Sequence, residues 1–352
     1  MLDAVLRPRS IAVIGASRRP NTIGYQILEN LVRHGFTGAV YPVNPTADAV
    51  HSIRAYPSVE DIPDAVDLAL LVVPKQHVCD AAEACGRKGV RGLIVISAGF
   101  AEVGGSGVER QKRLMEIVRR YDMRLVGPNC MGVLNTAPDR SMNATFAPTM
   151  PPAGPVSFMS QSGAMGVTIL DYAAEYGIGI SQFVSVGNKP DVSGNDLIQY
   201  WAEDERTGVI LMYLENFGNP RKFTQLAREI TRRKPIIAVK SGRSVAGARA
   251  ASSHTGALAG TDAATDALLR ASAACCARTR WRRCSTWRWR SATSPCRGGT
   301  AWPSSPTRAG RGSSSPTRVR RTGSSSRSWR RRRGPCWRRT SRRKRRSRIP
   351  WT

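Results

Sequence analysis

The chain has 352 residues, enough for two or three domains, and its formal net charge is +29. This charge is concentrated at one end: residues 1–270 hold 29 basic and 25 acidic side chains, whereas residues 271–352 hold 25 basic side chains and no acidic one. The sequence has no run of roughly eighteen apolar residues and no signal-peptide pattern, which argues against a membrane span and favours a cytoplasmic protein. Cys79, Cys85 and Cys130 are widely spaced, which favours reduced thiols over a disulfide framework.

Short apolar runs alternate with amphipathic stretches in the first part of the chain. Strands are predicted at residues 10–15, 39–43, 68–73, 92–97 and 124–127. Helices are predicted at residues 23–34, 78–88 and 108–121. Because strands and helices alternate, the pattern predicts an α/β domain with a parallel sheet and helices on both faces.

A proline-rich stretch at 148–155 predicts a linker, and a second α/β unit follows it. Its predicted strands are residues 156–160, 180–186, 209–214 and 235–240. Its predicted helices are residues 163–176, 193–204 and 219–233. The expected organisation is therefore a domain at 1–147, a domain at 148–270 and a basic tail at 271–352.

The loop Gly15-Ala16-Ser17 joins the first predicted strand to the first predicted helix. Such loops present backbone N–H groups and a positive helix end to phosphates. The loop lacks the G-x-G-x-x-G pattern, and Asn44 follows the second strand where a ribose-binding acid is expected. Dinucleotide binding is therefore disfavoured, and a tight turn in an ordinary α/β fold explains the loop equally well.

Two further strand ends carry chemically active side chains. Cys130 lies in Gly127-Pro128-Asn129-Cys130, but no histidine is an obvious activating partner, so a packing thiol is the preferred interpretation. Ser160-Gln161-Ser162-Gly163 opens a predicted helix and can cradle a phosphoryl group. A serine hydrolase is a weak alternative because residue 160 is not the glycine of G-x-S-x-G, and helix capping by Ser160 or Ser162 is the structural alternative.

His254 lies in a stretch of small residues, 251–260. Neutral imidazole accepts a phosphoryl group near pH 7, and small neighbours leave room for a phosphorylated ring to move. Glu215, at the end of the strand 209–214, is placed to hold an imidazole N–H. The structural alternatives are a surface histidine and a solvated glutamate.

Seven motifs occur in the order of one known family, over about residues 5–270. They are Ile14-Gly15-Ala16-Ser17, Pro42-Val43-Asn44-Pro45, Ser97-Ala98-Gly99-Phe100, Gly127-Pro128-Asn129-Cys130, Ser160-Gln161-Ser162-Gly163, Ser185-Val186-Gly187-Asn188 and Ser253-His254-Thr255-Gly256-Ala257. Together they resemble the nucleoside-diphosphate-forming acyl-CoA synthetases, the superfamily of ADP-forming acetyl-CoA synthetase and succinyl-CoA synthetase. The resemblance implies a Rossmann-like CoA-binding domain followed by a flavodoxin-like domain with a phosphohistidine loop.

The resemblance also implies an acid–thiol ligase reaction through an acyl phosphate and a phosphohistidine at His254, oriented by Glu215. The coenzyme A site it implies is lined by Gly15, Ala16, Ser17, Pro42, Asn44, Pro74, Ser97 and Asn129. The phosphoryl group is expected at Ser160, Gln161, Ser162, Gly163, Gly187 and Asn188.

The expected small molecules are coenzyme A, phosphate and a small carboxylic acid. No ATP-grasp domain is visible in this sequence, so ADP or ATP and Mg²⁺ are expected only through a β-type ATP-grasp partner subunit or a missing segment. No metal site and no membrane contact are expected in this chain. A CoA-binding regulatory module without turnover is the first alternative, and nucleic-acid binding through the basic tail is the second.

The tail from about Ser272 contains Trp and Arg but almost no branched aliphatic residues, so it cannot build an ordinary core and is expected to be disordered. We hypothesise a shift of reading frame, in the gene or in its recorded sequence. Read one nucleotide late, the codons CTG GAG GAG for Leu-Glu-Glu become codons for Trp-Arg-Arg. Three stretches, at 281–290, 305–312 and 348–352, read back into plausible sequence of the family's next domain, a flavodoxin-like unit. The alternative is a genuine basic arm that binds single-stranded nucleic acid.

Sequencing the gene across the codons for residues 265–280 tests this hypothesis. We expect one extra or missing nucleotide there, with the corrected frame continuing the family pattern downstream. An intact frame would refute the hypothesis, and the basic tail would then be a genuine translated segment.

Overall fold

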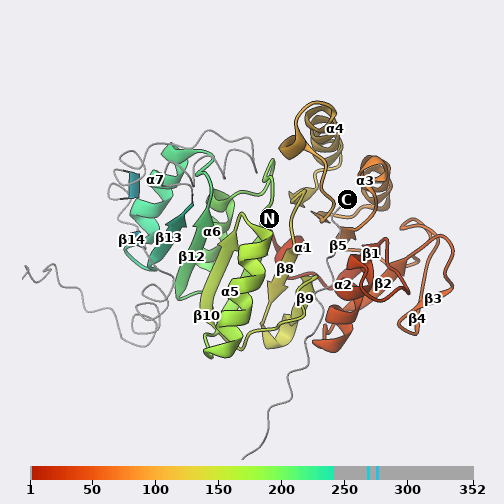
Figure 1. The fold of residues 1–352 in the computed structure, drawn as a ribbon, viewed down its shortest axis with the longest axis horizontal. Helices are drawn as coiled ribbons and strands as arrows, with labels where there is room; N and C mark the ends of the chain where they lie inside the picture. Colours follow the sequence, from red (N-terminus) through yellow and green to blue (C-terminus); the bar gives the residue numbers. More distant parts are fainter. Residues whose placement is uncertain (1, 242–267, 270–274, 277–352) are drawn as a thin grey trace, which may run out of the picture. The chain divides into compact units, whose positions relative to one another are not determined.

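The computed structural model describes residues 2–241, 268–269 and 275–276. In this part of the chain, two large sheets are flanked by helices, and β3 and β4 form a separate two-stranded antiparallel sheet (Figure 1). The α/β fold class predicted from the sequence is confirmed. His254 and most of the basic tail lie outside the described residues, so the interpretations that depend on them stay predictions. Within the described part of the chain, no helix is long and apolar enough to cross a membrane.

The first sheet has the strand order β2-β1-β5-β6-β7, and every neighbouring pair is parallel. Its strands are β1 (Ser10–Ile14), β2 (Ala39–Val43), β5 (Leu68–Leu71), β6 (Gly92–Val95) and β7 (Arg124–Val126). Its covering helices are α2 (Ile23–Arg33), α3 (Val78–Lys88) and α4 (Ser106–Arg120). Each of these elements was predicted from the sequence within a few residues of its bounds.

The two faces of this sheet follow from the alternation of side chains along its strands. Val13 of β1 packs in the core cluster that contains Ile27 and Leu31 of α2. Its neighbour Ala12 packs in the other cluster, with residues of α3 and α4 such as Ala82 and Leu114. Helix α2 therefore covers one face of the sheet, and α3 and α4 cover the other.

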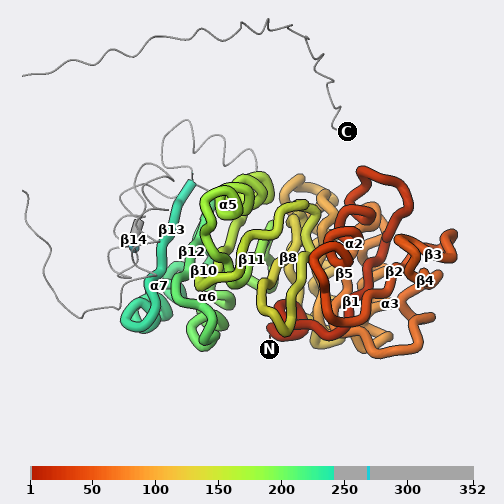
Figure 2. Tube along the Cα trace, turned by 90° about the horizontal axis from the view of Figure 1, so that it is seen from below, coloured from red at the N-terminus to blue at the C-terminus, as the bar shows by residue number. Residues whose placement is uncertain are grey.

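The second sheet has the order β14-β13-β12-β10-β11-β8-β9, and β13, β12, β10, β11 and β8 follow one another from left to right in Figure 2. The parallel strands are β10 (Ala153–Ser160), β11 (Ile180–Ser185), β12 (Val209–Leu214), β13 (Ile236–Lys240) and β14 (Cys275–Cys276). Antiparallel strands β8 (Gly132–Asn135) and β9 (Met142–Thr145) complete it at one edge.

Strands β8 and β9 were not predicted from the sequence, although both are fully buried. They precede the proline-rich stretch, yet they hydrogen-bond into the sheet that is built mainly from residues beyond it. The other elements that the sequence did not predict are short: α1 (Asp3–Leu6), β3 (Ala49–Val50), β4 (Ile53–Arg54), η1 (Lys75–His77), η2 (Ala101–Val103), η3 (Pro138–Arg140) and β14, which lies in the segment assigned to the tail.

Three helices cover the second sheet, and the sequence marks where each begins. The hydroxyl of Ser162 accepts from the N–H of Met165 at the start of α5 (Gly163–Glu175). Ser193 and Asp196 form a capping box at the start of α6 (Gly194–Glu203), and Asn219 precedes Pro220 at the start of α7 (Pro220–Ile230). Apolar side chains of α5 pack in one core cluster, and those of α6 and α7 pack in another, so the helices lie on opposite faces.

Buried polar side chains join α2 to the second sheet. The side-chain amide of Asn30, which is 3% exposed, donates to the carbonyls of Thr145 and Ala147 at 2.8 and 2.9 Å. Helix α2 thus lies against β9 (Figure 1). Because buried carbonyls require donors, this side chain fixes how the end of β9 meets the helix.

Replacing Asn30 by alanine removes the donor of two carbonyls inside the protein. We expect Asn30→Ala to lower the free energy of unfolding by about 2–3 kcal/mol, measured by urea denaturation. Val32→Ala on the same helix is the control, since Val32 is half exposed and its loss is expected to change stability by less than about 0.5 kcal/mol. Equal effects of the two substitutions would contradict the assigned role.

Candidate functional site

A groove of about 550 Å³ lies at the carboxyl edge of the first sheet. It is lined by residues of the β1–α2 loop and of the β2 and β5 ends: Gly15, Ser17, Arg18, Arg19, Thr22, Ile23, Gly24, Asn44, Thr46, Ala47 and Val72. The side-chain amide of Asn44 donates a hydrogen bond to the carbonyl of Ala16 at 2.7 Å and so holds the β1–α2 loop against the end of β2. The groove is therefore the place where an open α/β sheet binds ligands.

Two glycines allow the backbone to pass closely through this groove. Gly15 has φ +93°, and a Cβ at this position would lie 2.7 Å from the carbonyl oxygen of Val72. A Cβ at Gly24 would lie 2.1 Å from the carbonyl oxygen of Gly15. The loop and the start of α2 consequently pack backbone to backbone, which leaves the helix N-terminus open to an anionic ligand.

Sequence reasoning missed the two guanidinium groups at this groove. Arg18 and Arg19 are both exposed and directly follow the loop Gly15-Ala16-Ser17. Two adjacent cations after a glycine-containing strand–helix loop are a signal for phosphate binding that could have been used. Thr22 and Thr46 add hydroxyl groups to the same lining.

The other expected CoA-lining residues lie elsewhere around the sheet. Pro42 is buried inside β2, and Pro74 is exposed just after β5. Ser97 follows β6, and its hydroxyl donates to the carbonyl of Val73 at 2.5 Å. The N–H of Asn129 donates to the carbonyl of Ser97 at 3.0 Å, so these two predicted residues meet at the carboxyl ends of β6 and β7.

The turn after β11 packs on the loop that contains Asn129. A Cβ at Gly187 would lie 2.2 Å from the carbonyl oxygen of Pro128, and Gly187 has φ +52°. The N–H of Asn188 donates to that same carbonyl at 3.0 Å. The carboxyl edges of the two sheets are thereby joined by direct backbone contact.

The side chain of Asn188 points to the first sheet's loops. Its amide nitrogen contacts Glu102 Oε2 at 2.5 Å and Gln111 Oε1 at 3.0 Å. The Glu102 carboxylate also accepts from the N–H groups of Gly99 and Phe100. Burial alone would raise the pKa of Glu102, but these hydrogen bonds outweigh it and hold the pKa below its ordinary value.

A network of hydrogen bonds around Gln161, called the Gln161 frame below, lies at the carboxyl ends of β10 and β12. The side-chain oxygen of Gln161 accepts from the N–H groups of Glu215 and Asn216 at 2.6 and 3.0 Å. The hydroxyl of Ser160 donates to the carbonyl of Ser162 at 2.7 Å. The candidate carboxylate Glu215 is therefore held through its backbone, at the edge where Gly163 begins α5.

Lys189 also belongs to the Gln161 frame. The sequence analysis did not single out this residue. Its ammonium donates to the carbonyl of Asn216 at 2.8 Å. Burial lowers the pKa of Lys189 to about 8, against the opposing effect of the nearby Glu215 carboxylate. A half-buried cation at a strand end is a signal that only the folded structure reveals.

These contacts bear on two alternatives raised by the sequence. Cys130 is buried, its thiol contacts the carbonyl of Val95 at 3.3 Å, and burial raises its pKa to about 12, which confirms the packing interpretation. Ser162 caps α5, as the capping interpretation predicted, and the expected phosphoryl contact at this helix start stays a prediction. Within the described ranges, no cluster of three or more His, Cys, Asp or Glu residues suits a metal ion.

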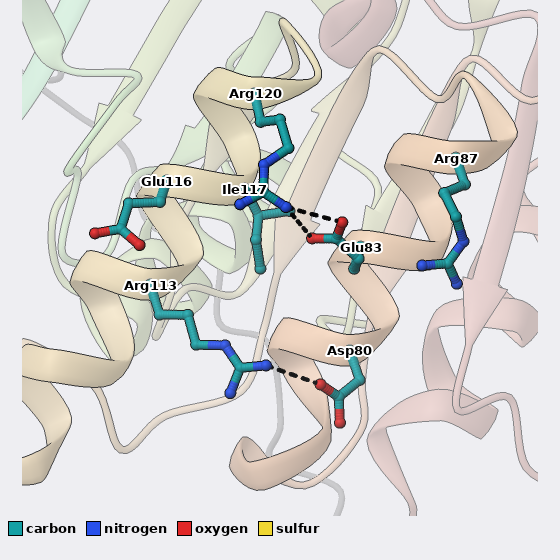
Figure 3. A pocket seen from close by; sticks show the side chains of 7 residues that line it. All are labelled: Asp80, Glu83, Arg87, Arg113, Glu116, Ile117 and Arg120. Atoms are coloured by element: carbon teal, nitrogen blue, oxygen red, sulfur yellow. Dashed lines mark hydrogen bonds and ion pairs between the residues drawn. The ribbon is translucent and has the colours of Figure 1, made fainter.

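A different groove lies between α3 and α4, and Figure 3 shows its charged lining. Arg113 pairs with Asp80 at 3.4 Å, and Arg120 pairs with Glu83 at 3.1 Å. Apart from the partly buried Glu83, these groups are largely exposed, and they neutralise one another, so they stabilise the fold little. None of them belongs to the motifs at the carboxyl edges.

Comparison with known proteins matches both halves of this arrangement. Residues 9–136 match the family described as CoA binding domain. Residues 153–280 match the family described as succinyl-CoA ligase like flavodoxin domain.

Individual relatives point the same way. The chain is 44% identical over 265 residues to the acetate–CoA ligase (ADP-forming) I α subunit of Pyrococcus furiosus, covering 74% of this chain and 57% of that one. It is 44% identical over 272 residues to the 4-hydroxybutyrate–CoA ligase (ADP-forming) of Nitrosopumilus maritimus, covering 77% and 39%. The structure of acetyl-coenzyme A synthetase 1 of Ca. Korarchaeum cryptofilum, in complex with phosphate and ADP, has a TM-score of 0.80 at 42% identity and covers 85% of this chain and 64% of that one.

These similarities define the class: a CoA-binding α/β domain followed by a succinyl-CoA ligase-like domain. The chain belongs to the family of the nucleoside-diphosphate-forming acyl-CoA synthetases, within which the ADP-forming acetate–CoA ligases are among its relatives. It spans about half the length, or less, of the relatives named above that were matched by sequence.

The ionised Glu102 carboxylate stabilises the contact between the two carboxyl edges. Because its folded-state pKa lies below the ordinary value, this stabilisation is present above the unfolded-state pKa and is lost as the pH falls through the folded-state pKa. We expect Glu102→Gln to reduce the free energy of unfolding by about 1 kcal/mol near pH 7, since solvent screens the half-exposed group, and by progressively less in acid.

Urea denaturation of both chains, from pH 7 downward, measures this difference. Glu109→Gln is the matched control, because Glu109 is exposed on α4 and pairs only with Lys112 among the residues described. A stability difference for Glu102→Gln that stays constant with pH would refute the assignment.

Proposed function

We propose that the chain is the α-type component of an ADP-forming acyl-CoA synthetase. One observation carries the proposal: the turn at Gly187 and Asn188 holds the CoA-side loop at Asn129 next to the frame that positions Glu215. A CoA thioester bound along the first sheet would then present its acyl carbon near the carboxyl edge of the second sheet, where the phosphoryl group is proposed to bind. The two halves of one reaction would meet at that junction.

The reaction proceeds in three balanced steps in the acid-forming direction. A phosphate oxygen attacks the thioester carbonyl, the C–S bond breaks, and CoA leaves as a thiolate that takes up a proton. The imidazole of His254 then attacks phosphorus, an N–P bond forms, and the carboxylate leaves with the bridging oxygen. Finally, an oxygen of the ADP β-phosphate attacks phosphorus, the N–P bond breaks, and ATP and free histidine result.

The proposed roles follow the positions of the side chains. The β1–α2 loop, with Asn44, holds the phosphates of CoA, and Arg18 and Arg19 add positive charge there. Ser97 and Asn129 line the path toward the thioester. The remaining expected CoA contacts, Pro42 and Pro74, stay proposals on the family resemblance.

At the second edge, the start of α5 and the Gly187 turn offer backbone N–H groups to the phosphoryl group. The side chains of Ser160, Gln161, Ser162 and Asn188 hydrogen-bond within the protein, so their contribution is to shape this edge. The carboxylate of Glu215 accepts a hydrogen bond from an imidazole N–H of His254 and so orients the ring.

The relatives suggest the substrate and the partner. Acetate is the proposed acid, with 4-hydroxybutyrate the next candidate, because both appear in the names of relatives. A relative named as an α subunit suggests a partner subunit, for which an ATP-grasp protein that binds ADP and Mg²⁺ is proposed.

Phosphohistidine formation tests the proposal without any partner. The full chain is incubated with acetyl-CoA and ³²P-labelled phosphate, and we expect protein label that is stable in base and labile in acid. His254→Asn should abolish it, and Glu215→Gln should reduce it by roughly tenfold or more, because an unoriented imidazole reacts slowly.

His77→Asn is the matched control, since His77 is exposed in η1 and is assigned no role. Absence of label with both acetyl-CoA and 4-hydroxybutyryl-CoA would overturn the proposal, and so would label that survives His254→Asn.

A further inference from the structure

We propose that Lys189 is a phosphoryl-binding residue: its ammonium receives the phosphate that attacks the thioester and stays with it as it becomes a phosphoryl group. This inference rests on the proposed function and names a residue that the sequence motifs did not include. Its support is the placement of Lys189 between the two carboxyl edges.

The backbone gives Lys189 little freedom. Gly187, Asn129 and Lys189 itself all have positive φ, at +52°, +60° and +51°. The N–H of Lys189 donates to the carbonyl of Val186 at 3.1 Å and closes a tight turn. A residue other than glycine rarely adopts such a φ, so the fold holds Lys189 in this orientation at some conformational cost.

The two side chains of the turn reach opposite partners. Asn188 reaches Glu102 beside the first sheet, and Lys189 reaches Asn216 beside the second. Gln161 holds the N–H groups of the same segment. The Glu215–Asn216 segment is thus held by two side chains. Gln161 binds the N–H groups of both residues, and Lys189 binds the carbonyl of Asn216.

The chemistry of the ammonium points to an anion. A lysine ammonium has three donors, and among the described residues it makes one hydrogen bond, to the carbonyl of Asn216. A half-buried cation is costly unless an anion stabilises it, and the charged group that acts on it in the described part of the chain is Glu215. A phosphate dianion would use the remaining donors and favour the charged ammonium.

The ammonium has a glycine beside it and lies at the sheet edge where α5 begins. Gly218, with φ +67°, lies beside the ammonium, and a Cβ there would be 3.8 Å from Nζ. The carboxyl ends of β10, β11 and β12 are adjacent in the sheet, so α5 begins at the same edge as Lys189. A phosphoryl group at this edge would meet both the ammonium and the positive end of α5.

Chemical modification tests the inference in the unaltered full chain. Reductive methylation with formaldehyde and borohydride attacks neutral amines, so at pH 8 Lys189 should react faster than lysines of ordinary pKa. Inorganic phosphate should slow its reaction by about fivefold, because a rise of one unit in a pKa of about 8 lowers the neutral fraction at pH 8 from about one half to about one tenth. Peptide mass spectrometry measures each lysine, and chloride at equal ionic strength is the reference.

Lys222 is the internal control, since it is exposed on α7 and pairs with Asp196 at 3.8 Å. Protection of Lys189 with no change at Lys222 supports the inference. Equal rates at Lys189 with phosphate and with chloride overturn it.

Variants separate binding from a purely structural role. Lys189→Met should raise the phosphate concentration for half-maximal ³²P labelling by about tenfold to a hundredfold, and Lys189→Arg should restore most of it. A structural role would instead lower the thermal midpoint of Lys189→Met and leave that concentration unchanged. If no label forms but phosphate still protects Lys189, the proposed function fails and the anion site stands. If label forms without protection, the anion site fails and the function stands.

Discussion

The contact between the turn at Gly187 and the carbonyls of Pro128 and Asn129 is the constraint on which the site depends. A side chain at residue 187 would push the two loops apart, because the oxygen atoms lie where its Cβ would be. Everything else at the junction follows from this approach. Asn188 reaches Glu102, Lys189 reaches Asn216, and the ends of both sheets face a common region.

The site is stabilised mainly through backbone groups. The Glu102 carboxylate accepts hydrogen bonds from N–H groups of its own loop, and the side-chain oxygen of Gln161 accepts them from the N–H groups of Glu215 and Asn216. The side-chain amide of Asn44 donates a hydrogen bond to the β1–α2 loop. These side chains position the loops, which leaves main-chain N–H groups and a few cations to meet a ligand. Such an arrangement suits phosphoryl chemistry, in which positioning and charge stabilisation dominate.

Much of the fold was predictable because its strands are short apolar runs bounded by glycine or proline, as at Gly15 and Pro74. Strands β8 and β9 were not, since Asn135, Asn143 and Thr145 interrupt their apolar pattern with buried polar side chains. The order of motifs gave the likeness to acyl-CoA synthetases. It did not reveal Lys189 or Glu102, because their importance arises from contacts between segments far apart in the chain.

Strands β8 and β9 also bear on how the chain acquires its structure during synthesis. They leave the ribosome before any parallel strand of the second sheet, and β8 pairs with β11, whose residues emerge about fifty positions later. Until then, the antiparallel pair can lie against α2, where Asn30 binds the end of β9. The first domain can therefore serve as the template on which the second sheet is assembled, so the order of synthesis and the order of docking coincide.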